Sequence, residues 1–293
     1  MSHAQKVTCM IPDRSESRKI RASWLSLVAI TSSLVLLISP AAASAKQIDR
    51  ATSFKSNSGF IPQRDGFSFA NWIATPSMGT GVELLVQIFG RNSICKNADS
   101  VDACIPFETA EQFAIQVEER LAQGRCEGLT VFAAKIFADG TTPASLIPIE
   151  KLSENIDFWW ATQMLPAVSA KSRSSRSLKP SQLIGEIRQG VLSGATSTLG
   201  MYFEGQGHTV LPISIEKKGN QVSVGVYDSN TPELTQTLRI NTKTQVWSYS
   251  PIDKEGKTIF SWHHKGSGAL DVIPLSLRTP QQTDYFSRAS IKE

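Results

Sequence analysis

The chain has 293 residues, 41% of them hydrophobic, and a formal net charge of +4 at pH 7. Residues 1–45 hold five basic and two acidic side chains; taking that +3 from +4 leaves residues 46–293 near +1. A charge this small gives no reason to expect a polyanionic partner. The sequence also lacks a Gly-rich phosphate loop and an aromatic-basic pattern, so we expect no nucleic-acid partner.

An export signal precedes the part of the chain that is expected to fold. Basic residues up to Arg21 are followed by an uncharged stretch, 22–45, which ends in Ala43-Ser44-Ala45. This layout predicts a signal peptide over residues 1–45, cleaved after Ala45, and a secreted or periplasmic protein that no longer contacts the membrane. The alternative is an uncleaved anchor, because the uncharged stretch is long enough to span a bilayer.

The cysteines agree with an oxidising compartment. Cys95 and Cys104 lie close together in a polar segment and predict a short disulfide loop. Cys9 belongs to the leader and is set aside with it. Cys126 is then expected to have no partner within the folded part, and to be buried and inert, paired between chains, or reactive.

Helices are predicted in the first half of the folded part. An apolar stripe over 82–89 ends at Gly90, and Thr109 with Gln112 suggests a capping box that starts a second helix. Residues 126–138 are apolar on most sides and predict a buried central helix closing at Gly140. Further helices are expected over 149–164 and 181–192. The Ser/Arg/Lys-rich stretch 170–181 predicts an exposed loop between helices, with a protease-sensitive activation site or a contact for an acidic substrate as the alternative.

Short β-prone runs separated by turn residues follow Gly194. We expect strands over 197–204, 208–216, 220–228, 234–241, 245–249 and 258–262. The fold class predicted is α+β: one domain over 65–278, with a helical half (65–193) packed against an antiparallel sheet half (194–278). Residues 46–64 and 279–293 are expected to be flexible flanks.

Cys126 is the residue with the clearest chemical signature. It would begin the central helix, where unpaired backbone N–H groups favour a thiolate. His208 and Asp228 follow on successive predicted strands. A cysteine, a histidine and a side chain that orients the histidine are the minimum set for thiol-based acyl chemistry, so a cleft between the two halves is expected to receive Cys126 and His208 from opposite sides.

The register of the two strands selects the orienting residue. A turn at Lys217-Lys218-Gly219 would place His208 opposite Asp228, with their Cβ atoms about 5 Å apart. A two-residue loop would instead make Asp228 and Asn230 diagonal neighbours of His208. Asp228 is therefore ranked above Asn230.

An oxyanion stabiliser is also required. The backbone N–H of Cys126 is one candidate donor, and Gln123 is the nearest side-chain amide, with Gln116 and Asn71 as alternatives. Glu127 is expected to stabilise the first turn of the helix, and a catalytic role is its alternative.

These residues resemble the papain-like cysteine peptidase superfamily in its broad sense. Gln123-Gly124-Arg125-Cys126 is similar to the Gln-Gly-x-Cys start of the papain signature. Gly207-His208 and Val226-Tyr227-Asp228 are similar to strands of bacterial C39-like and transglutaminase-like relatives. The resemblance implies a papain-like fold and a thiol protease, hydrolase or acyltransferase acting on peptide-like amides without a cofactor or metal. A non-catalytic binding or structural module of the same fold is the alternative.

Overall fold

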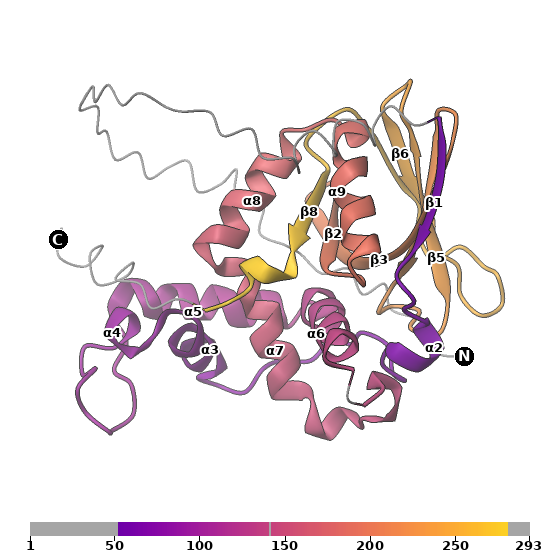
Figure 1. Ribbon diagram of the computed structural model, residues 1–293. Helices are drawn as coiled ribbons and strands as arrows, with labels where there is room; N and C mark the ends of the chain where they lie inside the picture. The colour runs from indigo at the N-terminus through magenta and orange to yellow at the C-terminus, as the bar shows by residue number, and fades with distance from the viewer. Residues whose placement is uncertain (1–51, 141, 281–293) are drawn as a thin grey trace, which may run out of the picture.

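Most helices precede residue 193 and most strands follow it in the computed structural model, which describes residues 52–140 and 142–280. Figure 1 shows α6 (Cys126–Asp139) between α7 (Ser153–Ala161) and the sheet, while α9 (Pro180–Leu192) lies beside the strands. The predicted α+β class is confirmed. The predicted leader, 1–45, and most of the predicted tail, 279–293, lie outside the described residues.

Helices α3 (Thr80–Phe89) and α6 follow apolar stretches of the sequence, and each ends at a glycine. Helix α3 ends at Gly90, and α6 ends at Gly140, which adopts a left-handed conformation with φ 65°. The remaining helices are α2 (Pro62–Asp65), α4 (Arg91–Ile94), α5 (Glu108–Leu121), α8 (Pro166–Arg176) and α9 (Pro180–Leu192). No helix in the described ranges is both long and apolar enough to cross a bilayer.

Two helix predictions need correction. The capping box at Thr109 is wrong: α5 begins at Glu108 after Phe107, whose own N–H is bound to the carbonyl of Ile94 at 2.9 Å, so the preceding loop sets the start. The single helix expected over 149–164 is divided into η3 (Ile149–Lys151), α7 and η4 (Thr162–Met164).

The Ser/Arg/Lys-rich stretch is largely helical, so the predicted loop is also wrong. Pro166 occupies the first turn of α8, where its missing N–H costs nothing. The Ser175 hydroxyl is buried and donates to the carbonyl of Val272 at 3.3 Å, and Arg176 Nε donates to Gly268 at 2.9 Å. Contacts with strand β8 (Leu270–Pro274) thus override the weak helix propensity of serine.

The sheet is antiparallel, with strand order β7-β6-β5-β4-β3-β2-β8. Its strands are β2 (Ser197–Phe203), β3 (Gln206–Lys218), β4 (Gln221–Tyr227), β5 (Thr235–Asn241), β6 (Val246–Tyr249), β7 (Trp262–Lys265) and β8. In addition, β1 (Ser53–Asn57) pairs with the end of β3, so part of the flank predicted as flexible is a strand. The sequence prediction also missed β8 and placed β7 too early.

Strand β3 bends in its middle, and this bend positions the candidate site. Its first half pairs with β2, whereas its second half pairs with β1 and β4. The register shifts between Pro212 and Ser214, which suits proline, since it has no N–H to donate at a bulge. His208 lies in the first half, beyond the end of β4.

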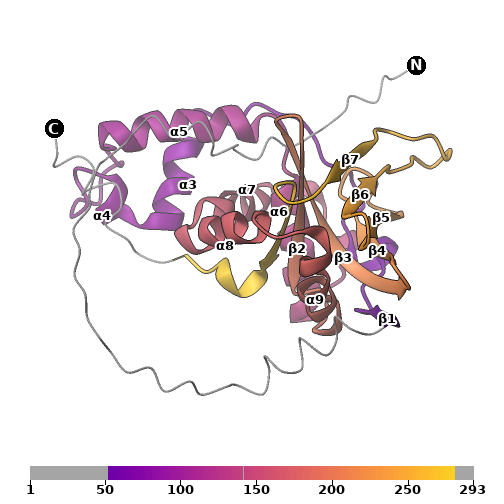
Figure 2. The same cartoon turned by 90° about the horizontal axis from the view of Figure 1, so that it is seen from above.

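The sheet carries a hydrophobic core on each face. Helix α9 packs with Val210, Trp247 and Tyr249 on one face of the sheet, which we call the inner face. Figure 2 shows this helix beside β2 and β3. Helix α6 packs on the other face with Leu211 and Tyr227. A Cβ on Gly128 would lie 2.1 Å from the Ile156 carbonyl oxygen, so this glycine allows α6 and α7 to approach closely.

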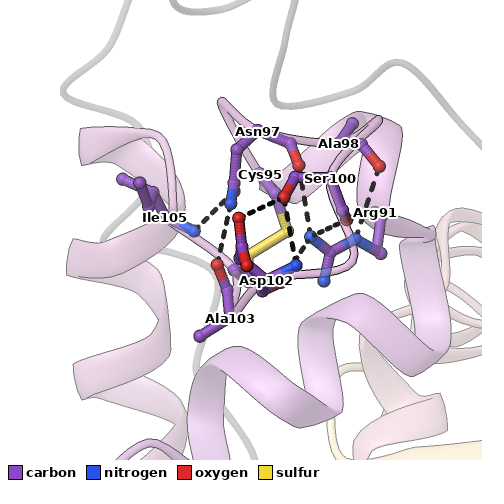
Figure 3. Close-up of a disulfide and its surroundings, with 9 residues drawn as sticks. Arg91, Cys95, Asn97, Ala98, Ser100, Asp102, Ala103 and Ile105 are labelled. Carbon is purple, nitrogen blue, oxygen red and sulfur yellow. Dashed lines mark hydrogen bonds between the residues drawn. A yellow bond between two sulfur atoms is a disulfide. The ribbon is translucent and has the colours of Figure 1, made fainter.

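The predicted disulfide between Cys95 and Cys104 is present, with Cα atoms 5.3 Å apart. Figure 3 shows the Arg91 side chain filling the loop between these two cysteines. Its guanidinium donates to the carbonyls of Asn97 at 3.2 Å, Ser100 at 3.0 Å and Asp102 at 3.1 Å. The disulfide is consistent with an oxidising compartment.

Candidate functional site

His208 and Asp228 form a buried ion pair at the end of β4. The strand ends at Tyr227, and the chain then turns, with the Thr231 N–H bound to the Asp228 carbonyl at 2.9 Å. This turn brings Asp228 Oδ1 to 2.9 Å from His208 Nε2. The Tyr249 hydroxyl donates to the other carboxylate oxygen at 2.5 Å. Both partners of the ion pair are fully buried.

The register that leads to this contact differs from the predicted one. The β3–β4 turn is at Gly219 and Asn220, with Lys218 paired to Gln221, rather than at Lys217-Lys218-Gly219. Gly219 takes φ +56°, which a tight two-residue turn requires. Continuing the pairing of Leu211 with Tyr227 would place Asn230 opposite His208. Asp228 reaches the imidazole because β4 has already ended, not because the two residues are paired on the ladder.

The Asp228 carboxylate is stabilised in its charged form. Burial by itself raises the pKa of Asp228, but the charge of His208 and hydrogen bonds from His208, Tyr249 and the Asn230 N–H together hold the pKa below its ordinary value. The Tyr249 hydroxyl keeps its proton, because burial and the neighbouring Asp228 charge raise its pKa well above the usual range. Asp228 therefore acts as an acceptor that holds the imidazole in place.

Aromatic rings surround His208 on the inner face of the sheet. Its ring centroid lies 6.5 Å from Tyr249, 6.1 Å from Phe260 and 6.4 Å from Trp262. The second ring nitrogen, Nδ1, has no hydrogen-bond partner among the described residues. In a neutral imidazole that donates Nε2–H to Asp228, Nδ1 would be the nitrogen that holds the lone pair.

Residues on both sides of Cys126 are bound to the segments that hold this ion pair. Before it, the Arg125 N–H donates to Asn71 Oδ1 at 2.8 Å. Asn71 in turn donates its backbone N–H to the Ser229 carbonyl at 2.8 Å and its side-chain amide to Asn230 Oδ1 at 3.1 Å. Asn71 therefore links the start of α6 to the turn that follows Asp228.

The side chain of Arg125 holds the entry to α6 in place. Its Nε is 2.6 Å from Asp157 Oδ1, and its guanidinium lies 5.0 Å from the centre of the Trp72 ring. Burial raises the pKa of Asp157, and the adjacent Arg125 opposes that rise. Arg125 is only 4% exposed, so both its guanidinium group and the aliphatic part of its side chain are buried.

Glu127, on the other side of Cys126, is also buried and charged. It forms an ion pair with Arg278 and accepts a hydrogen bond from the Thr209 hydroxyl, next to His208. Arg278 also donates to Thr162 Oγ1 at 3.1 Å and to Thr198 Oγ1 at 3.0 Å. Glu127 thus joins the helix to the sheet, which goes beyond the first-turn stabilisation predicted for it. Arg278 had no signal in the sequence.

Cys126 itself is fully buried, and its sulfur is in a disulfide whose other half lies outside the described residues. The prediction that pairing Cys95 with Cys104 leaves an unpaired thiol at Cys126 is therefore wrong for this structure. That prediction set the remaining cysteine of the sequence, Cys9, aside together with the leader.

His208 and Thr209, which are consecutive in β3, point to opposite faces of the sheet. Successive residues of a strand point to opposite faces. Thr209 contacts α6 through Glu127, and the Thr130 hydroxyl donates to its carbonyl at 3.1 Å. His208 points to the inner face, with Tyr249 and Trp262. The structure thus brings His208 and Asp228 into contact on the α9 face of the sheet, whereas α6, which begins at Cys126, packs on the opposite face.

The three amides considered for an oxyanion hole lie in different places. Asn71 is the one bound to the residue before Cys126. Gln123 lies in the turn before α6, and its buried Oε1 has no partner among the described residues. Gln116 lies on the exposed face of α5.

A cavity of about 530 Å³ opens beside the site, within the usual range of ligand pockets. Asn71 and Asn230 lie at its wall together with Phe260, which packs edge-on against His208. The rest of the wall comes from the loops that follow β4 and β6. Neither Cys126 nor His208 lines this cavity, so it is not the cleft predicted between the two halves.

No family model matches this chain, and neither a curated protein nor a solved structure is detectably similar to it.

Proposed function

We propose that the protein is an exported thiol hydrolase or acyltransferase with a papain-like fold, which acts on peptide-like amides in its reduced form. The observation that carries the proposal is the His208–Asp228 ion pair, together with the hydrogen bonds that tie Arg125 and Glu127, on either side of Cys126, to residues next to that pair. A cysteine at a helix start is activated when an oriented imidazole comes within reach of its thiol, so the proposal requires His208 to reach Cys126 once the thiol is free.

The chemistry begins with reduction of the disulfide at Cys126. A dithiol reductant is oxidised to its own disulfide, and Cys126 and the cysteine bonded to it are both released as thiols. His208 takes the thiol proton at Nδ1, while Asp228 holds Nε2. The thiolate attacks the carbonyl carbon of an amide, and the leaving amine takes the proton from His208. Water or a second amine then attacks the thioester, giving hydrolysis or acyl transfer and regenerating the thiol.

The test is the reactivity of Cys126 in the full chain after treatment with dithiothreitol and desalting. Alkylation by iodoacetamide is followed at Cys126 by peptide mass spectrometry between about pH 5 and 9, bracketing the ordinary thiol pKa of about 8.5. We expect faster labelling than in the same protein unfolded in urea, with an inflection at lower pH. His208→Gln should remove both effects, provided its circular dichroism matches the parent.

An ordinary pH profile with no acceleration in the folded chain would contradict the proposal. A matched control is Gln116→Ala, which removes an exposed amide on α5. Release of amine from casein by the reduced protein, absent in Cys126→Ala, separates turnover from thiol reactivity.

A second candidate function is a non-catalytic module of the same fold. The observation that favours it is the complete burial of His208 and Cys126, with the imidazole enclosed by aromatic rings. In that case Cys126 stays unlabelled in the folded, reduced chain at every pH, and the His208–Asp228 pair acts only in stability.

A further inference from the structure

We propose that one end of the sheet, which carries a cluster of basic side chains, binds the anionic headgroups of a membrane surface. We call this cluster the basic end; it consists of Arg173, Arg176, Lys179, Lys243 and Lys265. The inference concerns the surface to which the exported protein attaches, so it does not depend on the thiol chemistry proposed for Cys126.

Hydrogen bonds between three connecting segments hold the basic end together. Gln245 lies in the turn between β5 and β6, and its side-chain oxygen accepts the Ser181 N–H of α9 at 3.2 Å. Its carbonyl accepts the Gly266 N–H of the loop between β7 and β8 at 2.9 Å. In that loop, the Gly268 N–H donates to the Arg176 carbonyl at 2.7 Å, and Arg176 Nε donates to the Gly268 carbonyl at 2.9 Å. The turn, the loop and the α8–α9 connection therefore lie side by side.

Each of these segments carries basic residues. Arg173 and Arg176 lie in the last turn of α8, and Lys179 directly precedes α9. Lys243 lies in the turn between β5 and β6, and Lys265 is the last residue of β7. All of them except the half-buried Arg176 are exposed. Figure 1 shows α8, α9 and β6 on the upper side of the molecule and α5 on the lower side.

Carboxylates within the described part of the chain do not neutralise the basic end. None of its five side chains forms an ion pair among residues 52–140 and 142–280. On the adjoining segments, Glu186 is paired with Lys171 at 2.6 Å and Glu216 with Lys218 at 2.7 Å. Glu204 remains at the rim, in the turn after β2. Five positive charges against this one negative charge leave the surface at +4.

The chain enters the folded part at the same end of the sheet. Thr52 is the first described residue, and its carbonyl accepts the Gly219 N–H of the turn between β3 and β4 at 2.9 Å. That turn contacts the β5–β6 turn, because the Thr242 N–H donates to the Asn220 carbonyl at 2.8 Å. Six residues lie between Thr52 and the end of the uncharged stretch at Ala45, a connection that spans at most about 25 Å. An anchor formed by that stretch would keep the basic end next to the bilayer.

The shape of the basic end favours a lipid surface over an acidic peptide or a small anion. Neither the cavity beside Asn71 nor the smaller cavity beside Asp65 is lined by any of its five residues. A surface of anionic headgroups can contact separate turns at the same time, and it attracts each lysine or arginine that comes near it. The proposal therefore differs from the sequence prediction, which has no membrane contact after cleavage of the leader.

The first experiment maps which lysines approach lipid in the full chain. The protein is mixed with an excess of phosphatidylcholine vesicles that contain either no phosphatidylglycerol or about 30% of it. Acetylation by a succinimidyl ester is then followed at each lysine by peptide mass spectrometry. We expect Lys179, Lys243 and Lys265 to react about fivefold more slowly with the anionic vesicles than with the neutral ones. The difference should disappear at about 0.5 M salt, which screens the attraction.

Matched variants test the charges themselves in a vesicle flotation assay. One variant replaces the three lysines of the basic end by glutamine, and its control replaces three exposed lysines outside it, namely Lys96, Lys254 and Lys257. Both variants lose the same net charge, and circular dichroism checks that both fold. Binding to neutral vesicles measures the contribution of the leader and is subtracted. The partition coefficient gained from phosphatidylglycerol should fall about a hundredfold in the first variant and stay within about threefold in the control.

The outcomes separate a membrane partner from an acidic peptide. Slower acetylation confined to the basic end supports the proposal even where the leader alone floats the whole sample. Equal acetylation with the two kinds of vesicle overturns the proposal, and so does equal protection of the three control lysines or an equal loss of binding in both variants. Polyglutamate that protects the basic end when anionic vesicles do not would identify an acidic peptide as the partner, and it would also overturn the proposal.

Discussion

Glu127 and Arg278 form a buried ion pair between the second residue of α6 and the residue that follows the last 3-10 turn, η5 (Leu275–Leu277). The two residues are 151 positions apart in sequence. Through Thr209 and Thr198, the pair also binds the first half of β3 and strand β2. It therefore holds together the helix that carries Cys126 and the strand that carries His208.

Removing one partner of this pair should be costly, because the other charge stays buried. Arg278→Met is expected to lower the free energy of unfolding by about 3–5 kcal/mol, whereas Glu127→Gln with Arg278→Met should cost less than the sum of the single changes. Urea denaturation measures both. Lys218→Met, which breaks the exposed Glu216–Lys218 pair, is the matched control with no expected effect. Equal losses for Arg278→Met and Lys218→Met would contradict the buried role.

Stability should depend on Asp228 at acidic pH. Its pKa is lower in the folded chain than the ordinary carboxyl value of 3.8, so the unfolded state binds a proton first as the pH falls. The stabilisation is present above the unfolded pKa and is lost as the pH falls through the folded one. Urea midpoints measured between about pH 3 and 6 should fall less steeply on acidification in Asp228→Asn than in the parent chain. If the urea midpoints of the variant and the parent chain change with pH in parallel, Asp228 does not contribute to the pH dependence of stability.

Asp271 should show the opposite sign. Burial raises the pKa of Asp271 above 3.8, although hydrogen bonds from Ser172 and Tyr202 oppose the rise. A carboxyl with a raised folded pKa favours folding below its unfolded pKa, and this contribution is lost as the pH rises through the folded value. The difference in urea midpoint between Asp271→Asn and the parent should therefore shift in favour of the variant as the pH rises from about 3 to 7. A shift in the other direction would show that Asp271 is held charged.

Gly128 tests the close approach of α6 to α7. Gly128→Ala places a methyl group 2.1 Å from the Ile156 carbonyl oxygen, a backbone atom that cannot rotate away, and should cost about 1–3 kcal/mol. Gly190→Ala in α9 is the matched change with a milder overlap, because its Cβ would lie 2.9 Å from the Ser197 Cβ and Oγ. Thermal unfolding compares the two. A Gly128→Ala variant as stable as Gly190→Ala would place the helices farther apart.

The disulfide loop offers a test that leaves Cys126 unchanged. Replacing Cys95 and Cys104 by serine should lower the free energy of unfolding by about 2–4 kcal/mol, since the unfolded chain is no longer constrained. Arg91 binds three carbonyls of this loop, so Arg91→Met should make it sensitive to limited proteolysis with both cysteines in place. Resistance of the Arg91→Met loop would show that the disulfide alone orders it.

Local sequence signals determined the fold class and most element positions. Gly90 and Gly140 end helices as predicted, because a left-handed or open backbone conformation is accessible to glycine at low cost. Short β-prone runs separated by turn residues located the strands from Ser197 to Tyr249. The short disulfide followed from two cysteines in a polar segment, since loop closure over so few residues depends on local chain geometry.

Only the tertiary structure decided the features that depend on contacts between distant residues. The serine-rich α8 is a helix because β8 packs against it. His208 meets Asp228 because β3 bends at Pro212 and β4 ends at Tyr227, which strand propensity does not encode. Arg278 lay at the edge of the predicted domain without any motif, yet it neutralises Glu127. A buried charge is tolerated only beside a partner, and which residue becomes that partner is set by the folded chain as a whole.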